Sequence, residues 1–256
     1  MRRLVRSVLL LGVTCCLVAG TAEAARWLVP AAAHATGEKD TNWRTDLQLS
    51  NPSDENVTVT VYLLRSKEDN SALETSSSHT VPAFGQVVVG DVFQSDFSFS
   101  GTGALLVECD DDRLVVTSRT YNLLGEGNEI GLPAGATYGQ FIPGVNVDDA
   151  LEAGQEGHIV YLAKSDAFRS NLGFCAASAN GGTATVTMYD ATGAETGTVV
   201  RIFAGFEQFQ WNDIFARAGA APTTAAKPGA VPSTNSTPRS RMITSLAAPS
   251  QIPLTG

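Results

Sequence analysis

The sequence has few residues of the kinds that build catalytic and metal centres. Its 256 residues include only four cysteines and three histidines. The histidines, His34, His79 and His158, stand in three separate segments that form no metal-binding pattern. The chain also has no Gly-x-Ser-x-Gly, no His-Glu-x-x-His and no Walker loop. We therefore predict a non-enzymatic protein that needs no cofactor.

Basic residues are scarce as well. The chain carries 17 basic and 26 acidic side chains, a formal net charge of −9. Residues 219–256 contain no acid, so the acidic excess is concentrated between residues 25 and 218. Such a body repels nucleic acid and anionic lipid, and we expect neither as a partner.

The N-terminus has the parts of an export signal. Arg2, Arg3 and Arg6 precede an apolar stretch, residues 8–18, that is too short to span a bilayer comfortably. Ala22-Glu23-Ala24 then places small residues at the −3 and −1 positions of a cleavage site. We predict that residues 1–24 are a signal peptide and that the protein is secreted, periplasmic or on the cell surface, without a membrane span.

An internal repeat organises the rest of the chain. Three pairs of segments match in the same order: 43–47 with 168–172, 57–62 with 184–189, and 84–93 with 206–215. The offsets differ by only a few residues, and the differences fall in predicted turns.

The repeated segments alternate between apolar and polar residues, which predicts half-buried strands. Asn51-Pro52-Ser53-Asp54 predicts the turn of a hairpin between strands at 43–50 and 57–63. We expect Asp91 and Asp213 each to cap one helical turn. Further strands are predicted at 27–31, 86–92, 103–109, 113–122, 138–145, 157–163, 171–177, 183–190, 197–203 and 206–211.

This pattern predicts an all-β protein with two tandem Ig-like β-sandwich domains, at residues 25–137 and 138–218. The segment 47–61 resembles the first hairpin of bacterial extracytoplasmic Ig-like modules. Residues 27–122 as a whole are similar to secreted β proteins of environmental bacteria that contain tandem Ig-like repeats. The resemblance implies a fold and an extracytoplasmic location, and no catalytic site.

The tail, residues 219–256, is rich in Ala, Pro, Thr and Ser and is predicted to be disordered. The second repeat then lacks counterparts of the strands at 103–109 and 113–122. Three explanations stay open: the first repeat or a second molecule completes the sheet by strand addition, the tail is a surface stalk, or the reading frame slips near residue 219. Residues 252–256 resemble an LPxTG sorting signal, but Ile252 replaces the usual Leu and no apolar segment follows, so we interpret the match as coincidence.

Cys109 and Cys175 are the cysteines outside the predicted signal peptide. Cys109 shares a strand face with Leu105 and Val107, whereas Cys175 lies on the face opposite Leu172 and Phe174. One thiol should point inward and the other outward, so we expect two free thiols and no disulfide.

Calcium is the most plausible small ligand. Acidic residues gather in two predicted loops and could offer hard oxygen ligands in an extracellular setting. Neither group has the spacing of a dedicated calcium loop, so a solvated acidic turn is the favoured interpretation. The candidates are Asp110, Asp111, Asp112, Asp148 and Asp149, with Glu152 and Glu156 nearby.

Two pairs of equivalent residues are candidates for an interaction surface. Arg44 corresponds to Arg169, and Tyr62 to Tyr189. Arg and Tyr anchor many interfaces, but cross-strand pairing with a carboxylate or a threonine is the favoured interpretation. The sequence predicts an exported surface or structural module whose partner is a protein or a glycan, with strand addition at the second repeat as a route to oligomers. The alternative is a glycan-binding accessory region, or an unrecognised site, of a secreted hydrolase.

Overall fold

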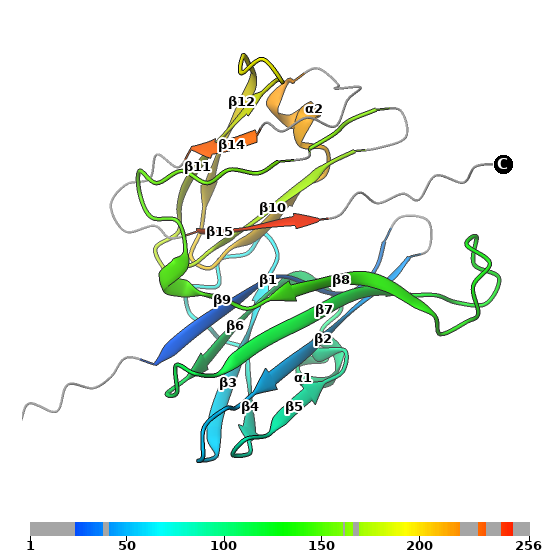
Figure 1. Cartoon of the computed structure of the whole chain (residues 1–256), viewed down its shortest axis with the longest axis vertical. Helices are drawn as coiled ribbons and strands as arrows, with labels where there is room; N and C mark the ends of the chain where they lie inside the picture. Colours follow the sequence, from blue (N-terminus) through cyan, green and yellow to red (C-terminus); the bar gives the residue numbers. More distant parts are fainter. Residues whose placement is uncertain are drawn as a thin grey trace, which may run out of the picture.

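The computed structural model describes residues 24–37, 41–160, 162–165 and 169–220, together with the backbone of 230–233 and 242–247. This part of the chain is mostly β and has antiparallel sheets and two short α-helices (Figure 1), which confirms the prediction of an all-β protein. Nearly all of the predicted signal peptide, residues 1–23, lies outside the described residues.

We call strands β1–β9 and helix α1 the first unit. Its elements are β1 (Ala25–Thr36), β2 (Asn42–Ser50), β3 (Val57–Arg65), β4 (Ser76–Val81), β5 (Gln86–Val89), α1 (Val92–Phe97), β6 (Gly101–Cys109), β7 (Val115–Leu123), β8 (Thr137–Pro143) and β9 (Val145–Asn146). A 3-10 turn, Val147–Asp149, follows β9.

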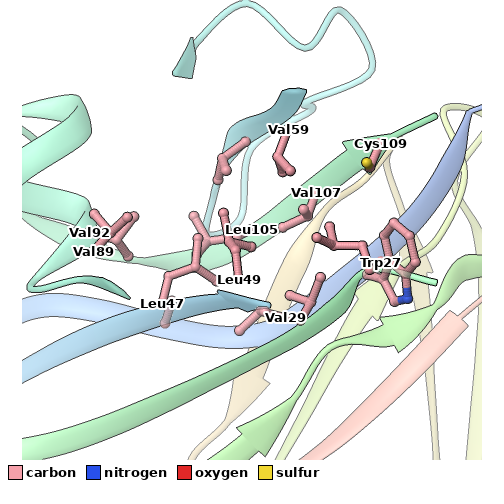
Figure 2. Close-up of a cluster of buried hydrophobic side chains, with 14 of the residues drawn as sticks. Trp27, Val29, Leu47, Leu49, Val59, Val89, Val92, Leu105, Val107 and Cys109 are labelled. Carbon is pink, nitrogen blue, oxygen red and sulfur yellow. The ribbon is translucent and has the colours of Figure 1, made fainter. Parts of the chain in front are cut away.

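Two layers of the first unit enclose its core. One layer contains β4, β3, β6 and β1 as far as His34, and the other contains β5, β2, β7 and β8. Strand β1 joins both layers because it pairs with β6 as far as His34, and its last two residues, Ala35 and Thr36, pair with β2. Its register on β6 shifts between Val29 and Ala32. Pro30, which has no amide hydrogen to donate, lies at this irregularity. Buried side chains of both layers, including those of Trp27, Leu47 and Leu105, pack between them (Figure 2).

We call the elements from β10 onward the second unit. They are β10 (Asn171–Ala176), β11 (Gly182–Tyr189), β12 (Glu195–Phe203), β13 (Gln208–Trp211), α2 (Ile214–Ala218), β14 (Ala230–Ser233) and β15 (Met242–Ala247). Its core is a separate cluster rich in aromatic rings. Phe174 packs edge-on against Phe203 and Trp211, with centroids 5.8 and 5.7 Å apart.

The two units pair their strands in the same way. Strand β2 lies between β5 and β7, and β10 lies between β13 and β15. Strand β3 lies between β4 and β6, and β11 lies between β12 and β14. Each unit also places one short helix after its fourth strand in this correspondence, α1 or α2.

Two described segments of the tail are strands, which its composition does not predict. Two of its segments occupy the positions that β6 and β7 hold in the first unit (Figure 1), where β15 pairs with β10 over six residues and β14 pairs with β11 over four. Without β14 and β15, the backbone amides and carbonyls along one edge of β10 and of β11 would lack hydrogen-bond partners. Pairing with the tail is favourable because it satisfies these groups.

Three other predictions of local structure need correction. Strand β4 is missing from the predicted strands, because its sequence Ser-Ser-Ser-His-Thr-Val has only one large apolar residue. No strand covers residues 157–163 in the described part of this segment, although Ile159 and Leu162 pack on the second core. Strand β8 pairs with β7 along its whole length, so residues 137–143 belong to the first unit and not to the second repeat.

Candidate functional site

Arg44 lies in a polar cluster at the start of helix α1, which we call the Asp91 cluster. The Asp91 carboxylate forms ion pairs with Arg44, whose Nε lies 3.1 Å away, and with His34, whose Nδ1 lies 2.8 Å away. Asp46 lies beside it on β2 and accepts the backbone N–H of Asp91 at 2.9 Å and the Tyr121 hydroxyl at 3.1 Å. Burial, and then the charge of Asp46, raises the pKa of Tyr121. Arg44 is thus paired with a carboxylate, which is the interpretation favoured from the sequence over a role in an interaction surface.

The second unit repeats part of this arrangement around Asp213. Lys164 lies 2.8 Å from the Asp213 carboxylate, and Asn171 accepts the backbone N–H of Asp213 at 3.2 Å. Burial opposes ionisation of Asp213, but hydrogen bonds from Lys164 and from the backbone lower its pKa below the ordinary value. Arg169, the counterpart of Arg44, is half-buried on the segment before β10.

The two aspartates differ in their role at the helix. Both have left-handed backbone angles, with φ of 47° for Asp91 and 72° for Asp213. The side chain of Asp213 accepts the N–H of Ala216 at 3.1 Å and so caps α2 as predicted. The side chain of Asp91 makes no such bond to α1, because it is engaged by Arg44 and His34.

A serine, a histidine and an aspartate meet between β4 and α1. The Asp96 carboxylate lies 2.7 Å from both the Ser77 hydroxyl and Nε2 of His79, and the serine and histidine atoms are 3.5 Å apart. A nucleophilic triad needs the serine and the carboxylate on different ring nitrogens of the histidine. Here both contact the same nitrogen, so the three residues tie an edge strand to a helix and do not form a proton relay.

The acidic residues considered for calcium lie in two separate loops. Asp111 is engaged by Arg113, whose guanidinium approaches it to 2.7 Å, and the hydrogen bonds from Arg113 hold the pKa of Asp111 well below its usual range. Asp110 and Asp112 are exposed beside it, and Asp148 and Asp149 are exposed in the 3-10 turn after β9. Across the described ranges, the structure gathers no three His, Cys, Asp or Glu side chains as potential metal ligands.

The tyrosine candidates are both half-buried. Tyr62 packs against a third cluster of buried side chains, and burial together with a hydrogen bond to Glu108 raises its pKa. Tyr189 lies opposite Glu195 on β12. Among the described residues, the strongly exposed aromatic side chains lie elsewhere: Phe84, 75% exposed in a turn, and Phe141, 66% exposed on β8.

The third cluster joins the two units, and we call this contact the junction. The first unit contributes the outer faces of β1, β3 and β6, the 3-10 turn after β9 adds Val147 and Ala150, and the second unit contributes the end of β10 and the turn before β13. The buried members are Leu28, Leu64, Ala104, Leu106, Val147, Ala150, Cys175, Ala177 and Phe206.

Hydrogen bonds reinforce the junction. The loop after β3 donates the N–H of Lys67 to the carbonyl of Gln208 and the N–H of Asn70 to the carbonyl of Gly205, both at 2.8 Å. The Asn70 side-chain amide also donates to the carbonyl of Phe206 at 3.2 Å. Backbone bonds at several points across an apolar contact fix the orientation of one unit on the other.

The junction also changes the expected environment of Cys175. Alternation correctly places this thiol on the face opposite Leu172 and Phe174, but that face packs on the first unit and is not exposed. Cys175 and Cys109 are both buried and both free, in agreement with the expectation of no disulfide. Burial raises the pKa of both thiols.

Comparison of the chain with protein-family models, with curated proteins and with solved structures finds no match. In the described part of the chain, no helix is both long enough and apolar enough to cross a membrane.

Proposed function

We propose that the chain is an exported, non-enzymatic protein of two Ig-like β-sandwich domains that acts outside the cytoplasm as a rigid interaction or structural module. The junction is the observation that carries this proposal. It combines nine buried side chains with backbone hydrogen bonds from Lys67 and Asn70, so the two units act as one body. A rigid body of this kind suits a spacer or a surface that presents fixed contacts, rather than a pair of lobes that closes on a substrate.

The Ig-like assignment is supported by the matched strand pairing of the two units and by the enclosed core of each. Export is supported by the N-terminal sequence, in which Arg2, Arg3 and Arg6 precede residues 8–18 and Ala22-Glu23-Ala24. The acidic composition favours a protein or glycan partner at the cell surface over nucleic acid.

Distance measurement between the units tests the proposal. Spin labels at Ser78→Cys on β4 and Thr198→Cys on β12, in a chain with Cys15 and Cys16 replaced by alanine, report the orientation of the units. Both labelled positions are exposed strand residues. Cys109 and Cys175 stay in place, because buried thiols with a raised pKa react slowly with the label. We expect one narrow distance distribution, and a broad one would contradict a rigid module. Leu64→Ala, which thins the junction, should broaden the distribution and serves as the positive control.

A second measurement addresses export. Mass spectrometry of the protein recovered from the medium or envelope of its host should give a mature N-terminus at Ala25. Recovery of the uncleaved chain from the cytoplasm alone would contradict the proposed location.

A further inference from the structure

An acceptor sequence for N-linked glycosylation lies where the turn after β2 leads into β3. Asn56-Val57-Thr58 has the pattern Asn-x-Ser/Thr in which x is not proline. Asp54 stands two residues before the asparagine, and bacterial oligosaccharyltransferases prefer an acid at that position. In an exported protein, such a match marks a modified asparagine where it lies on the surface of the fold.

The structure meets this condition. Asp54, Asn56 and Thr58 are all exposed, and Asn56 is the last residue before β3. Asn51, at the start of the same turn, is the opposite case. It is followed by Pro52, its side chain is 2% exposed, and its amide nitrogen donates to backbone carbonyls of the turn and of the neighbouring segment.

The amide nitrogen of Asn56 is available for reaction. Oδ1 of Asn56 accepts the backbone N–H of Ala83 at 2.9 Å, which sets the orientation of the side-chain amide because only its oxygen can accept this bond. Nδ2 of Asn56 makes no hydrogen bond to the described chain. A glycosylated asparagine keeps its carbonyl oxygen, so the bond from Ala83 survives the modification.

Asn56 and the hydrogen bonds of the junction lie at opposite ends of β3. Asn56 precedes this nine-residue strand, and the loop that carries Lys67 and Asn70 follows it. At about 3.3 Å per residue, the strand separates the two by roughly 30 Å. A glycan on Asn56 therefore leaves these bonds between the two units intact.

We propose that Asn56 carries an N-linked glycan in the exported protein. The proposal rests on the proposed export, because the sugar donor, a lipid-linked oligosaccharide diphosphate, is used outside the cytoplasm by a membrane oligosaccharyltransferase of the host. Nδ2 of Asn56 forms a bond to C1 of the first sugar, and the bond from C1 to the diphosphate oxygen breaks. The lipid diphosphate leaves with the electron pair, the amide gives up one proton, and no atom is oxidised or reduced.

Mass spectrometry of the full mature chain, recovered from the medium or envelope of its host, tests the proposal. We expect the peptide that contains Asn56 to carry the added mass of several sugar residues, and Asn56→Gln to lose it completely. Peptide mapping separates this site from the other match in the chain, residues 235–237, which lies outside the described residues.

Variants of the threonine test whether the acceptor sequence itself is recognised. Thr58→Val removes the hydroxyl and keeps a β-branched residue on the strand, so it should also lose the glycan. Thr60→Val makes the same change two residues later, outside the acceptor sequence, and is the matched control. Thr58→Ser restores a hydroxyl and should keep the glycan. Circular dichroism confirms that each variant is folded.

The outcomes separate this proposal from the proposed export. A chain that begins at Ala25 and has an unmodified Asn56 overturns the glycosylation and leaves export standing. An uncleaved chain recovered from the cytoplasm alone overturns both. Sugar that stays on this peptide in Asn56→Gln or in Thr58→Val also overturns the proposal, because another residue would then carry it.

Discussion

Arg201 and Glu207 form an ion pair beneath strand β12, and Glu207 is the one charged residue that is buried in the described chain. The guanidinium of Arg201 lies over the ring of Phe209, 4.0 Å from its centroid. The second carboxylate oxygen of Glu207 accepts the N–H of Ala204 at 2.9 Å. Strand β12 ends the order β12-β11-β14, and an inward charge on such an edge strand disfavours uncontrolled pairing with other strands.

The first prediction concerns this ion pair. Arg201→Leu leaves the buried Glu207 charge without its partner, a change that costs about 3–5 kcal/mol at fully buried pairs. Because the Arg201 side chain is 32% exposed, we expect a loss of about 2–3 kcal/mol in the free energy of unfolding. Urea unfolding measures it. The double variant Arg201→Leu/Glu207→Leu should recover most of the loss, and a double variant as unstable as the single one would contradict the argument.

The second prediction uses the two equivalent phenylalanines. Phe206→Ala removes a ring that is 3% exposed and should destabilise the chain by about 3–4 kcal/mol, as expected for truncation of a buried phenylalanine. Phe84→Ala removes a ring that is 75% exposed and should change stability by less than about 0.5 kcal/mol. Both substitutions place alanine on the same left-handed backbone, so backbone strain cancels between them. Equal losses in thermal or urea unfolding would contradict the assignment of Phe206 to the junction.

Alternation of apolar and polar residues accounts for the strands that the sequence predicts well. In β3, Val59, Val61 and Leu63 face the first core because each is two residues from the next. Alternation does not predict β4, because most of its residues are serine or threonine. Such residues can form an edge strand without a buried apolar face. The prediction for residues 157–163 fails in the opposite way. Ile159 and Leu162 pack on the second core, but the described backbone there forms an isolated bridge at Ile159 and no strand.

The alternation of residues within one strand cannot predict the junction. Its members on the second unit, such as Cys175 and Ala177, are small residues on faces that alternation assigns to the outside. Their burial depends on the first unit, which supplies Leu28, Leu64 and Leu106 from faces that also look external. The Asp91 cluster is partly predictable, because the repeat singles out Arg44, but its partners His34 and Asp91 come from distant segments.

The third prediction concerns alkaline pH. Burial raises the pKa of the Cys175 thiol in the folded chain above its unfolded value of about 8.5. The unfolded chain therefore loses this proton first, so the stability that the neutral thiol contributes is complete below pH ~8.5 and declines as the pH rises above it. The slope approaches about 1.4 kcal/mol per pH unit for one proton.

Urea unfolding of the wild type and of Cys175→Ala between pH 7.5 and 10 checks this prediction. The variant should be less stable at pH 7.5, because it loses packing in the junction, but its stability should fall less steeply above pH ~8.5. Parallel pH profiles for the two proteins would show that Cys175 ionises no differently in the folded and unfolded chains.

The last prediction concerns the tail strand β15. The register places the Cα of Ile243 opposite that of Cys175. Facing Cα atoms of an antiparallel pair lie about 4.5–5.5 Å apart, which is within the range that a disulfide bridges. Refolding of Ile243→Cys with oxidised glutathione should therefore join the introduced thiol to Cys175 in one chain, detected as the loss of two hydrogens and as one cross-linked peptide.

Refolding is needed because a buried thiol with a raised pKa reacts slowly in the folded protein. Thr244→Cys is the matched control, since the register pairs this position with Phe174 and not with Cys175. Equal cross-linking of the two variants, or none in either, would show that β15 does not hold this register on β10.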